Sequence, residues 1–310
     1  MKKSTGHFIF IFIILSFLPI PTIGDININQ INEKYHTMLV EKGIEITLKI
    51  IGNHYLSDEI TSDECHILLH EVGEYASLKY GLNDSLKQAT DSIELCRSGF
   101  IHGLFLGTDI TQINNTAICT KNSFKNSALK LNCLHGLGHG LAVSFDYNLS
   151  PAIKICKSAE TKEYQSACAT GIFMEEFSPR AHFSSNATKE TFSICEKTEF
   201  KAECYWYVGI RIIQSNTLSE GINECHKVNI NHQRDCYRGF GVLTARKMNY
   251  EANAIFSICK NLKECLFGAA SEFGQSTEIS KSLSFCNQLL WQQKSRCFLE
   301  MIYSYSKHLY

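Results

Sequence analysis

Cys133-Leu134-His135-Gly136-Leu137-Gly138-His139-Gly140 is the stretch on which the rest of the chain is patterned. Its two histidines are four residues apart, a spacing that places both imidazoles on one face of a helix. Gly136 and Gly140 share that spacing and form a ridge where a second backbone can come close. Each of the three glycines costs a helix about 1 kcal/mol relative to alanine. We therefore expect close helix packing or a bound ligand to compensate for them.

The motif Cys-x-x-Gly recurs along the chain with a regular period. Copies begin at Cys96, Cys133, Cys168, Cys236 and Cys265, while Cys204 and Cys297 keep the register with Tyr207 and Glu300 in place of glycine. Successive cysteines of this series are 29 to 37 residues apart. A period of that size is typical of helix pairs that stack one on another. The predicted fold class is all-α, with disulfide-stapled two-helix repeats stacked as an α-solenoid.

A second series of cysteines ends the other helix of each repeat. A cysteine of the first series follows each of them 6 to 14 residues later, so the simplest pairing is local. The predicted bonds are Cys119–Cys133, Cys156–Cys168, Cys195–Cys204, Cys225–Cys236, Cys259–Cys265 and Cys286–Cys297. Each stabilises the fold by up to about 3 kcal/mol through chain entropy. Cys65 and Cys96 remain and would pair with each other, although no loop separates the two helices that meet at Cys96.

Helical periodicity fills the segments between the cysteines, and no strand alternation stands out. Before the repeats, Ile28 to Ile51 reads as a helix broken at Gly43, and Asp58 to Asp63 as a loop. We divide the chain into a signal peptide (1–24), an N-terminal helical segment (25–62), histidine-rich helical repeats (63–147) and cysteine-rich helical repeats (148–310).

The first residues predict export. Met1-Lys2-Lys3 precedes an apolar block from Phe8 to Leu18, and turn-forming residues follow up to Gly24. This is the pattern of a secretory signal peptide, and the block is shorter than the roughly 20 residues that span a bilayer. The mature chain would then begin near Asp25 without a membrane span. Retention of the segment as an anchor is the alternative.

The cysteine content indicates the compartment of the protein, and the charge balance excludes some classes of partner. Fourteen cysteines, an even number, indicate disulfides formed outside the cytosol: in a periplasm, the extracellular space or a secretory lumen. The 30 Lys and Arg residues balance 31 Asp and Glu residues, with no long run of either sign. This balance argues against binding to nucleic acid or to anionic membranes.

The C-terminal repeats resemble Sel1 and tetratricopeptide units. The resemblance is carried by Gly239-Phe-Gly241 early in one helix and by Ala252 and Ala254 in the next. It implies a helical-hairpin solenoid with a binding role, and it brings no catalytic residue with it. It covers two or three repeats and none of the histidines discussed below.

Five histidines in the N-terminal half form a candidate metal site. His66 and His70 make one pair at four-residue spacing, and His135 and His139 make another. His102 occupies the repeat position of His139, six residues after the leading cysteine, so the stack should bring the two together. Two such pairs plus His102 can supply the ligands for zinc, copper or iron. We also expect the helix that starts at Cys65 to dock through Gly73 against the glycine ridge.

Two carboxylates lie close to His70 in the sequence. Glu71 and Glu74 are candidate ligands, orienting partners or catalytic bases. His70-Glu71-Val72-Gly73-Glu74 departs from the zinc-protease motif, which has histidine at the last position, so a protease is not inferred. Noncovalent haem stays open, whereas covalent c-type haem lacks its Cys-x-x-Cys-His motif. Glu175-Glu176 could be a carboxylate pair that reaches toward the site, but a solvated helix face is the favoured interpretation.

Two functions remain in competition at this point. The first is an exported helical-repeat protein that binds a transition metal through the five histidines; whether it is also an enzyme is left open. The second is a metal-free solenoid scaffold that binds a protein, peptide or glycan, with histidines and glycines serving only to pack helices.

Overall fold

The computed structural model describes residues 28–57, 59–89, 96–111, 116–120, 127–177, 188–215, 217–260, 262–275 and 279–309. This part of the chain is helical and contains no strand, which confirms the all-α prediction for it. The predicted signal peptide, residues 1–24, lies outside the described residues.

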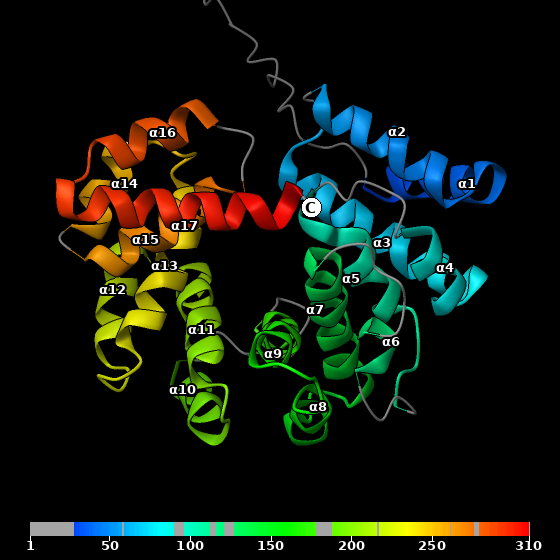
Figure 1. Cartoon of the computed structure of the whole chain (residues 1–310), viewed down its shortest axis with the longest axis horizontal. Coiled ribbons are helices and arrows are strands. Elements are labelled where there is room, and N and C mark those ends of the chain that lie inside the picture. The colour runs from blue at the N-terminus through cyan, green and yellow to red at the C-terminus, as the bar shows by residue number, and fades with distance from the viewer. Residues whose placement is uncertain are drawn as a thin grey trace, which may run out of the picture.

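Helices of two kinds alternate along most of the chain, longer odd-numbered ones and shorter even-numbered ones (Figure 1). They are α1 (Ile28–Lys42), α2 (Ile44–Leu56), α3 (Ser62–Tyr80), α4 (Leu82–Ala89), α5 (Gly99–Leu106), α6 (Ala117–Thr120), α7 (Ser127–Ser144), α8 (Leu149–Cys156), α9 (Lys162–Glu176), α10 (Thr188–Lys197), α11 (Lys201–Ser215), α12 (Leu218–His226), α13 (Gln233–Lys247), α14 (Ala252–Cys259), α15 (Lys263–Phe273), α16 (Ile279–Asn287) and α17 (Trp291–Leu309). A short 3-10 turn, Cys96–Ser98, precedes α5.

The N-terminal boundaries follow from local chemistry. Gly43 separates α1 from α2 at a φ of 82°, a conformation that glycine adopts without steric cost, so the predicted break is confirmed. Thr61 and Glu64 form a capping box that starts α3 at Ser62. The loop expected up to Asp63 therefore ends earlier, because the cap satisfies the first amides of the helix.

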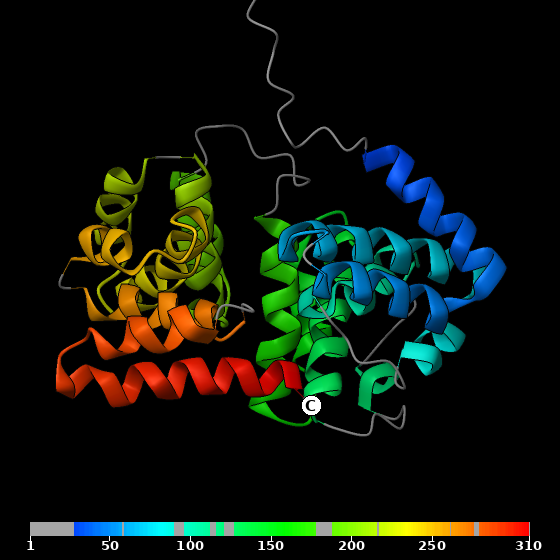
Figure 2. The ribbon, with the colours of Figure 1, turned by 90° about the horizontal axis from the view of Figure 1, so that it is seen from above.

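The odd-numbered helices pack in series. From α3 to α17, each odd-numbered helix contacts the next odd-numbered one. The even-numbered helices pack against their neighbours in sequence and flank this series. In Figure 1, α1 to α7 lie on one side and α10 to α17 on the other, with α8 and α9 between them. Figure 2 shows the same two groups from above, with α17 along one edge of the second group.

The recurring glycines are the points at which neighbouring odd-numbered helices touch. A Cβ on Gly99 would lie 2.5 Å from the His66 carbonyl oxygen, and one on Gly136 would lie 2.9 Å from that of Ile101. Gly171, Gly239 and Gly268 are equally closed in by a carbonyl of the preceding odd-numbered helix. Only glycine allows such close approach of two backbones.

The three glycines of α7 lie at its contacts with two different helices. Gly136 and Gly140 face α5, while Gly138 faces the Cys168 carbonyl on α9. Close packing thus compensates for the glycines, as predicted. Gly73, expected against the ridge of α7, packs instead against the Phe100 carbonyl of α5. The reason is that α5 lies between α3 and α7 in the series.

All fourteen cysteines are paired, and every predicted pairing is confirmed. The bonds are Cys65–Cys96, Cys119–Cys133, Cys156–Cys168, Cys195–Cys204, Cys225–Cys236, Cys259–Cys265 and Cys286–Cys297. Six of them join the end of a short helix to a cysteine within the first two turns of the next odd-numbered one. Such a set of bonds fits an oxidising compartment. Among the described residues, no helix has the length and apolar character that crossing a bilayer would require.

Candidate metal centre

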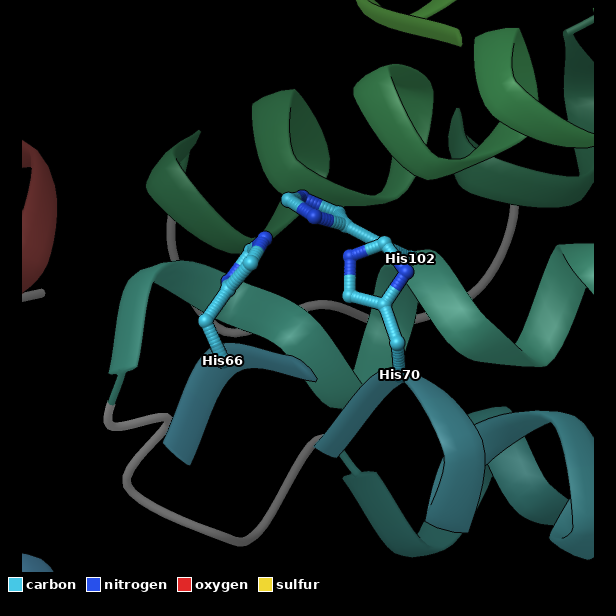
Figure 3. A group of neighbouring side chains, drawn as sticks. All are labelled: His66, His70 and His102. Carbon is cyan, nitrogen blue, oxygen red and sulfur yellow. The ribbon is translucent and has the colours of Figure 1, made fainter. Parts of the chain in front are cut away.

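Five histidines from three successive odd-numbered helices meet in one place, which we call the histidine cluster. His66 and His70 lie on α3, His102 on α5, and His135 and His139 on α7. Figure 3 shows His66 and His70 pointing from α3 toward His102. The helical spacing and the repeat register both predicted this convergence.

Backbone contacts at glycine hold the three helices close enough for the rings to meet. A Cβ on Gly103 would collide with the His70 carbonyl, and one on Gly136 would lie 3.2 Å from the His102 Cα. The glycines that directly follow His102 and His135 therefore lack the side chain that would push the neighbouring helix, and its imidazoles, away.

The imidazole rings are in mutual contact. Ring centroids are 4.6 Å apart for His66 and His70, 5.5 Å for His66 and His102, 5.3 Å for His70 and His102, 4.7 Å for His102 and His135, 5.1 Å for His102 and His139, 4.9 Å for His135 and His139, and 5.6 Å for His70 and His139. The cluster is thus continuous from α3 to α7.

Two sets of three histidines have the geometry of metal ligands. One is His66, His70 and His102, and the other is His102, His135 and His139. Within each triad, one nitrogen from every ring lies within 4.8 Å of the others. His102 belongs to both. Three imidazoles can bind zinc or copper and leave a further coordination position open.

Hydrogen bonds fix which nitrogen of three of these rings carries the proton. His66 Nδ1 lies 2.8 Å from the Cys96 carbonyl oxygen, and His139 Nδ1 lies 2.9 Å from Glu175 Oε2. Because a carbonyl and a carboxylate can only accept, both Nδ1 atoms donate. The Nε2 atom of each neutral ring then carries the lone pair that a metal ion needs.

In His135, too, Nδ1 carries the proton, and its acceptor is a hydroxyl group. Its Nδ1 lies 2.9 Å from Thr170 Oγ1, whose own proton goes to the Ala167 carbonyl oxygen at 2.7 Å. The hydroxyl therefore accepts from His135 Nδ1, and the lone pair of His135 is also on Nε2. The partners of His135 and His139 both come from α9.

The Nε2 atoms of His135 and His139 are 3.2 Å apart. With both Nδ1 atoms acting as donors, the two Nε2 atoms can share one proton in a hydrogen bond or act together as ligands of one metal ion. Two bonds of about 2.05 Å from these atoms to one ion would enclose an angle of about 100°, close to tetrahedral. The pair is therefore arranged as ligands on a shared ion would be.

The histidine cluster is largely buried. His70, His102 and His139 are 6%, 5% and 1% exposed. Burial, followed by the neighbouring imidazoles, holds the pKa of His102 well below its usual value. A neutral ring keeps the lone pair that metal binding requires, so no proton has to be displaced from this residue first.

The carboxylate that accepts the hydrogen bond from His139 belongs to Glu175 on α9. Glu175 and Glu176 on α9 are 3% and 5% exposed, so their interpretation as a solvated face was wrong. Glu175 takes on His139 the orienting role that we expected of Glu71 or Glu74, which lie half-buried on α3. Burial raises the pKa of Glu176 to about 7.

A signal for Glu175 was present in the sequence. It stands seven residues after Cys168, one past the position that His139 occupies after Cys133, and apolar residues flank the Glu175-Glu176 pair on both sides. Two acids with apolar residues on both sides, on a helix of the repeat, indicate that the acids are buried with the apolar residues.

Compared with known proteins, the chain matches no protein-family model, no curated protein and no solved structure. A function for it is therefore inferred from the geometry of the histidine cluster.

Proposed function

We propose that this protein is an exported, disulfide-stapled α-solenoid that binds transition-metal ions through His66, His70, His102, His135 and His139. The observation that carries the proposal is the pair of Nε2 atoms of His135 and His139, 3.2 Å apart with both Nδ1 atoms held by acceptors. In their neutral form, the two rings offer adjacent lone pairs to one ion, which supports metal binding.

The ligand set narrows the class of ion. The ligands are imidazoles with a carboxylate behind one of them, a set that suits zinc, copper(II) or iron(II). Haem fits the packing poorly. Two axial histidines on one haem iron place their ligating nitrogens about 4 Å apart on opposite sides of a porphyrin, whereas His135 and His139 stand side by side on one helix.

Catalysis is compatible with the site but is not required by it. A three-histidine site can hold water in its remaining position and lower the pKa of that water. Glu71 and Glu74 on α3 are candidates for a base that would act on such a water.

The disulfides and the serial packing of the helices support the proposal without being part of the site. The seven disulfides fit an oxidising compartment, where imidazole ligands are not in competition with free thiols. The serial packing of odd-numbered helices fits a solenoid, and this packing is what aligns equivalent repeat positions into a cluster.

Metal analysis of the untagged protein tests the proposal. Protein stripped by chelator, reconstituted with zinc or copper(II) and desalted should retain stoichiometric metal. His102→Ala should lose most of it, because His102 belongs to both triads. His226→Ala is the matched control, since His226 is exposed on α12, away from the cluster. Absence of stoichiometric metal in the wild-type protein would refute the proposal.

A further inference from the structure

The two histidine triads share one residue, His102. The number of metal ions that the cluster can bind depends on whether this residue can serve both triads at once. His102 on α5 stands between the α3 pair, His66 and His70, and the α7 pair, His135 and His139. All five rings do not form one ligand group; the described residues give two groups of three. The inference below rests on the proposed function and extends it.

Distances within each triad suit one ion per triad. An ion about 2.05 Å from a ring nitrogen lies about 3.2 Å from the ring centroid, so two imidazoles at about 90° to 120° on one ion have centroids about 4.5 to 5.6 Å apart. The six ring pairs inside the triads span 4.6 to 5.5 Å. The ring spacings therefore match those of imidazoles on one ion, and ring nitrogens that lie within 4.8 Å of one another would move closer together on binding it.

His102 differs from His66, His135 and His139 in how its Nδ1 is used. His66, His135 and His139 each give Nδ1 to an oxygen acceptor, which leaves Nε2 as the ligand atom. The Nδ1 of His102 is buried and has no hydrogen-bond partner among the described residues. A buried ring nitrogen without a partner is uncommon in a native structure and calls for an explanation such as an unseen ion.

We propose that the histidine cluster is a two-ion site in which His102 bridges the ions, one on each of its ring nitrogens. The first ion is bound by His66, His70 and His102, and the second by His102, His135 and His139. Binding of the second ion displaces the remaining ring proton of His102 to solvent, which leaves a bridging imidazolate. The two ions are then about 6 Å apart, from two bonds of about 2 Å and the width of the ring.

Copper(II) is the probe, because it prefers imidazole ligands and reports on its neighbours magnetically. Stripped protein is titrated with copper(II), and bound ions are counted by native mass spectrometry. The wild-type chain should bind two. His70→Ala and His139→Ala should each bind one, because each variant breaks one triad, and His102→Ala should retain neither ion tightly.

The bridge has its own readout in electron paramagnetic resonance. Two copper(II) ions coupled through an imidazolate should give a signal weaker than the sum of two isolated ions. The one-ion variants should show the full signal of a single isolated copper. Circular dichroism and disulfide mapping verify folding, and His66→Ala and His135→Ala, at half-buried positions, replace any variant that fails to fold.

The outcomes separate the two proposals. One copper per wild-type chain overturns the two-ion inference and leaves the proposed function intact, while no copper overturns both. Two coppers whose signals simply add, or two coppers still bound by His102→Ala, overturn the bridging role of His102.

Discussion

Replacing Glu175 should weaken metal binding without unfolding the protein. Its carboxylate accepts a hydrogen bond from His139 Nδ1 at 2.9 Å, and the two side chains are 4% and 1% exposed. The carboxylate stabilises the positive charge that the imidazole shares with a bound ion. Its loss therefore costs more in the metal-bound state than in the metal-free state.

The magnitude follows from what each substitution leaves behind. Glu175→Gln keeps an acceptor oxygen and loses only the charge, so we expect the Kd to rise about tenfold, or about 1.4 kcal/mol. Glu175→Ala leaves a buried N–H without its acceptor, so the rise should approach about 100-fold, or about 2.7 kcal/mol.

The assay is a competition titration with a chromophoric chelator at pH 7.5, using copper(II) or zinc. Glu163→Gln is the control, because Glu163 is an exposed acid in the first turn of the same helix. An unchanged Kd for folded Glu175→Ala, or an equal loss in Glu163→Gln, would show that this carboxylate does not act through His139.

Three further predictions concern the scaffold. Gly138→Ala should lower the free energy of unfolding by about 1 to 3 kcal/mol in urea titrations, despite alanine's better helix propensity, because its Cβ meets the Cys168 carbonyl; a neutral or stabilising effect would contradict this packing. Removing the Cys65–Cys96 bond, which closes 31 residues, should cost about 3 to 4 kcal/mol by the same measurement. Stability should fall as pH rises from about 4.5 to 7 through Glu176, whose folded pKa of about 7 is above its unfolded value. Glu176→Gln should thus stabilise the protein by about 1 to 3 kcal/mol at pH 8 and flatten that slope in thermal melts.

The helical fold, the disulfides and the ligand histidines could be predicted because they depend on local spacing. A cysteine 6 to 14 residues from its partner has few alternatives, and histidines four apart share a helix face. The role of Glu175 could not be predicted, because it depends on how α9 is rotated against α7. The docking of Gly73 was missed for a related reason, since only the packing order places α5 between α3 and α7.

The hydrogen bond from His66 to the Cys96 carbonyl links one histidine of the cluster to a disulfide cysteine. Cys65 and Cys133 lie within α3 and α7, and Cys96 lies just before α5. The reduced chain would offer fourteen thiols that compete with imidazole for soft ions. Oxidation removes these competitors and positions His66 at the same time. We therefore expect oxidation to precede metallation, so that ions met before the disulfides form are bound by thiolates and released as the bonds close. Stopped-flow loading of reduced and oxidised chains would measure that order directly, and equal loading of the histidines in both would exclude it.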